Sequence, residues 1–571
     1  MPARVPKELK EIRKYGDEEI EVIYRKTRSM ANVDPSRYYP PLMPRQYVEE
    51  GIHVDQDVPV PLRDGTIIYA DVYRPEGVTG KLPAILGCSP MGKRFGYMPK
   101  EMLTHGVPPG AISKMARFEG PDPAFFCHYG YAIVNPDARG SGNSGGDAYC
   151  WGTQEGRDCA DIVEWVAARD WCTGKVGMSG NSWLAMVQWL AAAEKPPHLA
   201  CIAPWEGTSD IYREFVLCGG FPEVGFNDRL ISRVTGGGRI EDYLAMAFKY
   251  PLMNAYWEDK IPRFEEIEIP AYITGGWSHF HLRGSIEGYR RISSAKKWLR
   301  VHRDFEWPDF HDAENLKDLI LFFDRYLKDI RNGWELTPRV RIDIMDAGDI
   351  DYQVKRPERE FPLARTQYRK YYLDAKSGTL SPNPVKPASS VSYDAKKGTA
   401  NFTMRFDEET ELTGYLKIRL WVEAKGNNDM DLFITVQKLD DQGEFMPVRV
   451  LKEPHPGFPG KLRVSHRELD EKLSTDYRPV QSHRRAQLLK AGEIVPVDIE
   501  IWPTSMIWHP GQQLRVVVSG HYFREPGWFE PFAWETLNKG THIIHTGGKY
   551  DSYLQVPVIP TRYQAGSYIY R

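Results

Sequence analysis

The stretch of sequence that decides the fold is Val176-Gly177-Met178-Ser179-Gly180-Asn181-Ser182-Trp183-Leu184-Ala185. It reads as a buried strand, a turn through Gly180-Asn181-Ser182 and the start of an apolar helix. A serine on such a sharp strand-to-helix turn projects its hydroxyl beyond the sheet, and the next backbone N–H points to where an oxyanion forms. The pattern therefore indicates the nucleophile elbow of an α/β-hydrolase, with Ser182 as the nucleophile and the N–H of Trp183 as an oxyanion donor.

The elbow differs from the usual Gly-x-Ser-x-Gly pattern at its last position, which Leu184 occupies. Ser179 is a rival nucleophile, but Met178 precedes it and it lies short of the helix. A side chain at Gly180 would collide with the incoming helix, whereas the small Ala185 lets helix and strand approach. These requirements favour Ser182.

Short apolar runs on both sides of the elbow are typical of buried strands, and amphipathic segments between them are typical of helices. Strands that alternate with helices predict a mostly parallel sheet. The strands are expected at residues 83–88, 131–135, 200–204, 270–276 and 298–302, the helices at 155–168 and 316–327, and a hairpin at 52–74.

The chain is 571 residues long, which predicts two or three domains. Residues 1–50 are predicted to form a helical extension, because charges alternate around a thin apolar stripe. An α/β-hydrolase domain is expected over 51–334, with a helical cap at about 208–265, a stretch too long for a plain crossover. Alternating segments between 415 and 518 predict an all-β, jelly-roll-like sandwich over 335–571.

Composition excludes several classes of protein. The net charge of −3 gives no case for nucleic acid, and no apolar run reaches the roughly 18 residues that span a bilayer. The seven cysteines form no pair with zinc spacing, so neither a metal nor another cofactor is expected. Their odd number, without a secretory signal, predicts reduced thiols in a cytoplasmic protein.

Several motifs together resemble the cocaine esterase and X-prolyl dipeptidyl aminopeptidase group of serine hydrolases. Besides the elbow they are Val58-Pro59-Val60-Pro61-Leu62-Arg63-Asp64-Gly65-Thr66, Asp137-Ala138-Arg139-Gly140-Ser141-Gly142, Phe322-Phe323-Asp324-Arg325-Tyr326-Leu327-Lys328 and Ser465-His466-Arg467-Glu468-Leu469-Asp470. The resemblance implies a hydrolase core, a helical cap and a C-terminal jelly-roll-like domain. It also implies cleavage of esters or amides by a Ser-His-Asp triad.

The chain departs from that group at the oxyanion hole. Members of the group commonly place a tyrosine after the third strand, and Met91 stands there in this sequence. A methionine side chain cannot donate a hydrogen bond. The N–H of Met91, or Tyr97, is the expected substitute.

The chain departs again at the acid and the base. The group's aspartate follows a Gly-Trp pair, but Gly276-Trp277-Ser278-His279-Phe280-His281 carries histidines instead. The group's histidine follows the next strand, where His302-Arg303-Asp304-Phe305-Glu306-Trp307 stands here. We therefore expect either His281 (or His279) as the base with Glu306 as its orienting carboxylate, or His302 as the base with Glu306 or Asp304.

The prediction is a serine hydrolase that forms an acyl-enzyme with an ester or amide of a medium-sized, partly apolar small molecule. Aromatic and polar side chains near the elbow are expected to line the pocket, namely Tyr97, Trp205, Trp277 and His279. Two alternatives stay open: an X-Pro dipeptidyl peptidase, and an altered member that performs a non-hydrolytic lyase or cyclisation step or binds a ligand. A homodimer is an open option for the assembly.

Overall fold

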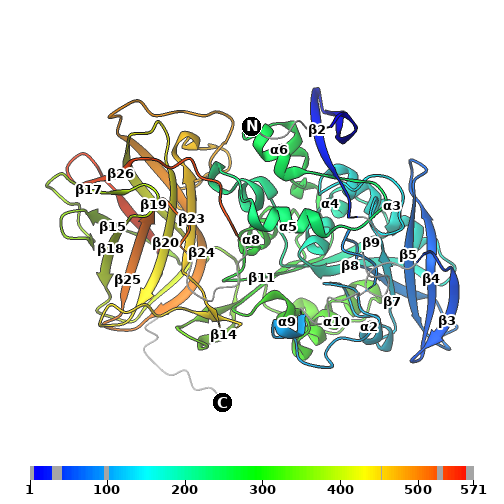
Figure 1. Ribbon diagram of the computed structural model, residues 1–571. Coiled ribbons are helices and arrows are strands. Elements are labelled where there is room, and N and C mark those ends of the chain that lie inside the picture. The colour runs from blue at the N-terminus through cyan, green and yellow to red at the C-terminus, as the bar shows by residue number, and fades with distance from the viewer. Residues whose placement is uncertain (1–5, 29–40, 95–101, 452, 524–531, 561–571) are drawn as a thin grey trace, which may run out of the picture. The chain divides into compact units, whose positions relative to one another are not determined.

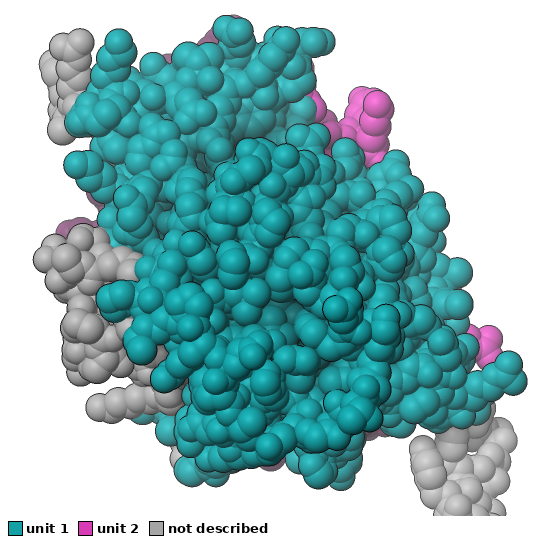
Figure 2. Space-filling view, turned by 90° about the vertical axis from the view of Figure 1, so that its right-hand side faces the viewer, with its two compact units in different colours: residues 1–341, 531–535 teal, residues 342–530, 536–571 magenta. Residues whose placement is uncertain are grey.

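The computed structural model describes residues 6–28, 41–94, 102–451, 453–523 and 532–560. The chain divides into two compact units (Figure 2): unit 1 comprises residues 1–341 and 531–535, and unit 2 comprises residues 342–530 and 536–571. Ser182 and the other predicted site residues that the structure describes belong to unit 1.

Unit 1 is built on a twisted sheet whose strands follow each other in the order β3-β4-β5-β7-β6-β8-β9-β11-β12. The first pairs are antiparallel, and all pairs from β7 to β12 are parallel, which confirms the predicted mostly parallel α/β sheet. The bounds are β3 (Arg45–Glu49), β4 (Ile52–Pro61), β5 (Ile67–Pro75), β6 (Leu82–Leu86), β7 (Ala132–Pro136), β8 (Cys172–Asn181), β9 (Leu199–Trp205), β11 (Ala271–Gly276) and β12 (Lys297–His302).

Helices cover both faces of this sheet (Figure 1), with α3, α4 and α8 on one face and α2 and α10 on the other. The strands in the middle are buried along their whole length, because helices exclude water from both of their faces. The bounds are α2 (Pro123–His128), α3 (Thr153–Ala167), α4 (Trp183–Ala193), α8 (Leu282–Arg291), α9 (Glu306–Phe310) and α10 (Ala313–Leu327).

Apart from a short 3-10 helix at Lys7–Leu9, the described residues 6–28 of the N-terminal extension are not helical, so the predicted helix there is wrong. Its described part forms an antiparallel hairpin of β1 (Lys10–Tyr15) and β2 (Glu18–Lys26), turned at Gly16 with φ of 56°. Ile20, Val22 and Tyr24 alternate onto one buried side of β2, while glutamates face outward. The charge alternation that predicted a helix is therefore the outer side of a strand.

Residues 208–265 contain the helices α5 (Gly225–Arg233), α6 (Tyr243–Lys249) and α7 (Ala255–Asp259), together with the short strand β10 (Arg239–Glu241). β10 pairs with β2, so the N-terminal hairpin and this insertion share a small sheet. Their apolar side chains pack with Trp183 and Met186, at the start of α4. The insertion thus lies next to the elbow. Among the described residues, no helix is long and apolar enough to cross a membrane.

Unit 2 consists mainly of antiparallel strands, as predicted for the β-sandwich, with short parallel pairings at Met345 and at Thr379. The long strand β19 (Thr410–Lys425) pairs with β24 along one edge, and with β26 and β27 along the other. A second set of strands runs β18-β25-β20-β23. The bounds are β13 (Val340–Met345), β14 (Asp351–Glu358), β15 (Gln367–Asp374), β17 (Ser389–Asp394), β18 (Thr399–Arg405), β20 (Asp431–Leu439), β23 (Phe458–Arg463), β24 (Val495–Trp508), β25 (Gln513–Ser519), β26 (Thr541–Thr546) and β27 (Tyr553–Ile559).

Candidate active site

Ser182 stands between the end of β8 and the first turn of α4, in a backbone conformation that L-residues rarely adopt (φ 54°, ψ −118°). Its own N–H donates to the carbonyls of Trp205 and Glu206, at 3.2 and 3.0 Å, which holds the turn against the end of β9. Ser182 is partly exposed, whereas Ser179 is fully buried inside β8. The turn therefore presents Ser182, and not Ser179, to a substrate.

Gly180 makes the close approach of strand and helix feasible. A Cβ there would lie 2.6 Å from Cβ of Leu184 and 2.8 Å from the carbonyl oxygen of Glu119, at a φ of 134°. We expect Gly180→Ala to destabilise unit 1 by about 2–3 kcal/mol, because both overpacking and backbone strain oppose it. Thermal unfolding with Gly80→Ala as the matched control measures this, since a Cβ at Gly80 meets nothing within 4 Å. Equal melting temperatures for the two variants would contradict the packing argument.

His281 is the imidazole that faces the serine. It lies at the start of α8, and its Nε2 is 3.1 Å from Ser182 Oγ. Its Nδ1 is 3.0 Å from Thr208 Oγ1. With the proton on Nδ1 donated to Thr208, Nε2 has a free lone pair and accepts the hydrogen bond from the Ser182 hydroxyl.

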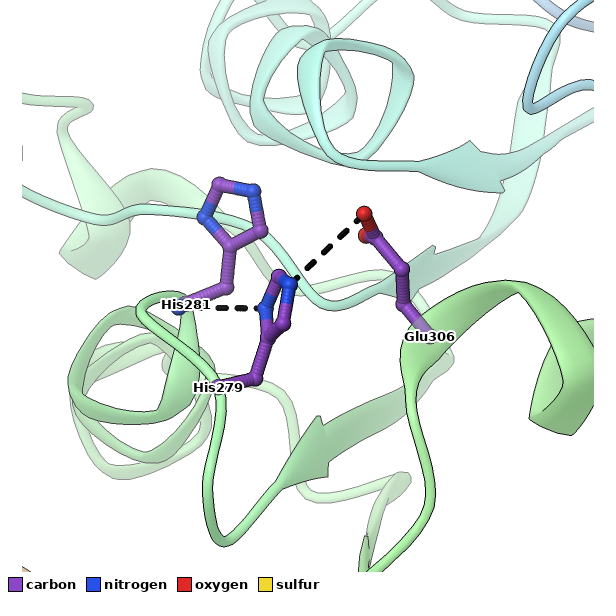
Figure 3. A group of neighbouring side chains, drawn as sticks. All are labelled: His279, His281 and Glu306. Atoms are coloured by element: carbon purple, nitrogen blue, oxygen red, sulfur yellow. Dashed lines mark hydrogen bonds and ion pairs between the residues drawn. The ribbon is translucent and has the colours of Figure 1, made fainter. Parts of the chain in front are cut away.

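The orienting group of His281 differs from the expected one. Glu306 was expected at its second nitrogen, but Thr208 stands there. Glu306 Oε1 instead lies 3.7 Å from Nε2 of His279. The reason is the backbone: Thr208 follows the end of β9, beside His281, while Glu306 begins α9 on the far side of His279 (Figure 3).

His302 is also placed away from the serine, so the arrangement with His302 as base, oriented by Glu306 or Asp304, does not form. Its Nε2 lies 2.9 Å from Glu206 Oε1 and 3.1 Å from Asp309 Oδ2. Burial, which alone would lower the pKa of His302, is outweighed by these two carboxylates, and its pKa is raised. The two acids thus favour the charged form of the buried His302 imidazole.

Glu206 is the buried carboxylate at the centre of this network. One oxygen contacts His302, and the other lies 3.0 Å from Nδ1 of His279. Burial would raise the pKa of Glu206, but the two histidines outweigh it and lower that pKa. Nδ1 of His279 accepts a hydrogen bond from the backbone N–H of His281 at 3.4 Å and lies 3.0 Å from Glu206 Oε2. Nε2 of His279 faces Glu306, 3.7 Å from its Oε1.

The surroundings of Glu306 favour its protonated form. Burial first, and then the charges of Glu119 and Glu206, raise its pKa well above the usual value of a carboxyl group. A protonated Glu306 carries no charge toward Ser182. Together with His279 and His281 it brings three potential metal-ligand atoms within 4.8 Å of one another (Figure 3).

The pKa of His281 is lowered well below 6.5, by burial first and then by His279. A histidine acts as a base only when neutral, so activity must rise as the pH rises through this pKa. We expect the acid limb of the kcat/KM profile to have its midpoint below pH 6.5, because kcat/KM reports the free enzyme. Ester hydrolysis measured from about pH 4 to about pH 9 checks this. A midpoint above 6.5 would rule out His281, in this environment, as the titrating base.

The three expected oxyanion donors have different surroundings in the structure. Trp183 is the first residue of α4, where an N–H has no intrahelical acceptor. Its indole Nε1 donates to Glu155 Oε1 at 2.7 Å, which anchors the helix start. The N–H of Met91 donates to Ser89 Oγ at 3.3 Å, so it already has an acceptor in this structure. Tyr97 lies outside the described residues.

Two predicted pocket residues are buried instead. Trp205 belongs to the core beneath the sheet edge, with its Nε1 donating to Asp309 Oδ2 at 3.0 Å, so its assignment to the pocket is wrong. Trp277 is 2% exposed. The side chains around His281 are phenylalanines: Phe280 lies 4.2 Å from its ring centroid, Phe215 lies 6.5 Å away, and Phe226 and Phe532 pack on Phe280.

Two residues of this site were not among the expected catalytic residues. Thr208 and Glu206 follow the end of β9, which neighbours the strand that carries Ser182. Residues that follow parallel strands meet at one edge of the sheet. This rule could have predicted Thr208 and Glu206 as site residues, because the sequence already predicted the strand at 200–204.

Comparisons with known proteins match both parts of the chain. Residues 64–233 match the family model of the X-Pro dipeptidyl-peptidases (S15 family), and residues 332–555 match that of the X-Pro dipeptidyl-peptidase C-terminal non-catalytic domain. A CocE/NonD family hydrolase of Staphylococcus aureus is 34% identical, with a TM-score of 0.85 over 92% of this chain and 100% of its own. Cocaine esterase of Rhodococcus sp. (strain MB1 Bresler) is 23% identical over 90% of this chain and 100% of its length.

An α-amino acid ester hydrolase of known structure is similar in fold alone. It is 16% identical and has a TM-score of 0.64, over 91% of this chain and 99% of its own.

Proposed function

The chain belongs to the CocE/NonD family of serine hydrolases, and on that premise we propose that Ser182 and His281 cleave an ester through an acyl-enzyme. The observation that carries the proposal is the 3.1 Å contact between His281 Nε2 and Ser182 Oγ. It joins a serine on a strained elbow to a neutral imidazole, which are the two groups that nucleophilic catalysis requires.

The chemistry follows from these contacts. As Ser182 Oγ attacks the ester carbonyl, its proton passes to His281 Nε2, and the N–H of Trp183 donates to the oxyanion. The imidazolium then returns that proton to the leaving alcohol, and the acyl group stays on Ser182. A water molecule, activated by the same nitrogen, releases the acid.

The second nitrogen of His281 keeps its proton throughout, donating to Thr208 Oγ1 at 3.0 Å. A hydroxyl orients the ring as a carboxylate does, but it adds no negative charge. Glu206 supplies that charge from a greater distance, since its carboxylate acts to raise the pKa of His281. We infer that Thr208 sets the tautomer and that Glu206 stabilises the imidazolium.

The aromatic side chains around His281 support an ester with an apolar group. Phe280 and Phe226 are partly exposed, and their rings lie 5.3 Å apart beside the base. Phe532 lies 5.5 Å from both. Such a group of rings favours a medium-sized, partly apolar acyl or alcohol moiety over a small polar one.

Hydrolysis of chromogenic substrates tests the proposal. We expect p-nitrophenyl esters to be cleaved, with kcat/KM rising from acetate to longer or aromatic acyl groups. We expect Gly-Pro-p-nitroanilide to be cleaved far more slowly, because the described contacts show no carboxylate pair reserved for a peptide amine. Preferential cleavage of the anilide would favour the X-Pro dipeptidyl peptidase instead. Turnover of neither substrate class would favour the non-hydrolytic alternative.

A further inference from the structure

We propose that the His279–His281–Glu306 cluster also binds a divalent transition-metal ion, best matched by Zn²⁺, and that the bound ion switches the hydrolase off. The ligands are Nε2 of His279, Nε2 of His281 and the carboxylate of Glu306, which releases its proton when the ion binds. Binding stands on geometry alone, whereas the inhibition rests on the proposed role of His281 as the base.

The donor atoms already surround one point. They all lie within 4.8 Å of one another, and His279 Nε2 is 3.7 Å from Glu306 Oε1. Tetrahedral zinc with bonds of about 2.1 Å places its ligand atoms about 3.4 Å apart. Shifts of about 1 Å in the side chains therefore complete the coordination. Figure 3 shows the two imidazoles and the carboxylate converging from two separate segments.

The cluster contains buried polar atoms that the described residues leave unsatisfied. Nε2 of His279 and Oε2 of Glu306 have no hydrogen-bond partner there, although the two residues are only 5% and 3% exposed. Buried polar groups are normally satisfied, so such atoms indicate a ligand. An ion at this point would satisfy both.

The outer contacts of the cluster are those of a metal site. A metal-binding histidine usually donates its other N–H to a carboxylate or another oxygen, which fixes the tautomer. Nδ1 of His279 lies 3.0 Å from Glu206 Oε2, and Nδ1 of His281 lies 3.0 Å from Thr208 Oγ1. Both histidines thus turn Nε2 inward.

The donor set selects the metal. Two imidazoles and one carboxylate suit zinc or cobalt, and not calcium or magnesium, which prefer oxygen ligands. Ser182 Oγ lies 3.1 Å from His281 Nε2, so the ion would compete with it for the lone pair of that nitrogen. An ion that takes the lone pair of that nitrogen removes the acceptor for the Ser182 proton, so the ester is no longer attacked.

Cobalt binding to metal-free Ser182→Ala protein tests the site without any catalysis. We expect one Co²⁺ per chain, with the visible absorption of a four- or five-coordinate ion, and displacement by Zn²⁺. His279→Gln and Glu306→Gln, each added to that variant, are expected to weaken binding by about 100-fold or more. His198→Gln is the matched control, because His198 pairs with Glu164 on the surface and is expected to change nothing.

Circular dichroism and thermal unfolding show whether each variant folds. If His279→Gln does not fold, the cobalt binding of Glu306→Gln tests the site instead. No saturable cobalt spectrum, or unweakened binding in the folded ligand variants, overturns the site. In wild-type protein, Zn²⁺ should lower ester hydrolysis by about tenfold or more, with reversal by EDTA. Full activity with zinc bound overturns the inhibition. Cobalt binding in a protein whose metal-free wild type hydrolyses no ester supports the site and overturns the proposed function.

Discussion

Replacing Ser182 with alanine is expected to lower kcat for ester hydrolysis by about 10⁵-fold or more, with the fold unchanged. The hydroxyl is the only group on the elbow positioned both to attack a carbonyl and to give its proton to His281, 3.1 Å away. Its loss removes little packing, because the side chain is small and partly exposed. Steady-state kinetics and thermal unfolding of the same preparation separate these two effects.

Ser179→Ala is the matched control for this experiment. Ser179 is fully buried in β8 and its hydroxyl has no hydrogen-bond partner among the described residues. Its removal should leave kcat within about twofold, because no reacting group is touched. A Ser182→Ala protein as active as Ser179→Ala would refute the elbow assignment.

Replacing His281 with glutamine is expected to lower kcat by about 10⁴-fold or more with little change in KM, because the base acts mainly in the transition state. The same measurement on Thr208 tests the tautomer argument. Thr208→Val removes the acceptor of the Nδ1 proton and should cost about 10- to 100-fold in kcat, the equivalent of one unsatisfied buried hydrogen bond.

Thr208→Ser is the control, since it keeps the hydroxyl and should restore most of that loss. If valine and serine at this position gave equal rates, Thr208 would only fill space. If His281→Gln kept wild-type kcat, the base would be another group.

The sequence predicted the parts of this site that depend on local pattern. The strand, the Gly180 turn and the apolar helix fixed the elbow, because their residues are neighbours in the chain. Histidines stand after Gly276-Trp277 where a carboxylate was expected, and this made His281 the predicted base. In the structure its Nε2 lies 3.1 Å from Ser182 Oγ. The catalytic roles themselves stay predictions until the kinetics are measured.

The hydrogen-bond partners of the histidines could not be predicted from the local sequence. Thr208 and Glu306 are both close in the sequence to a strand end, so spacing alone cannot choose between them. The choice depends on which side of the His279 ring each backbone passes, a detail of tertiary packing. The prediction of a helix in the N-terminal extension failed for a related reason. Strand β2 pairs with β10, which lies more than 200 residues further along the chain, and local pattern does not show such a partner.

The central claim is that His281 activates Ser182, and labelling with a fluorophosphonate tests it most directly. Mass spectrometry of the wild-type protein should find one adduct, on the peptide that contains Ser182. The rate of labelling should fall by about 10³-fold or more in His281→Gln, because a serine without its base is a weak nucleophile. Labelling of another residue, or equally fast labelling of Ser182 without His281, would contradict the account.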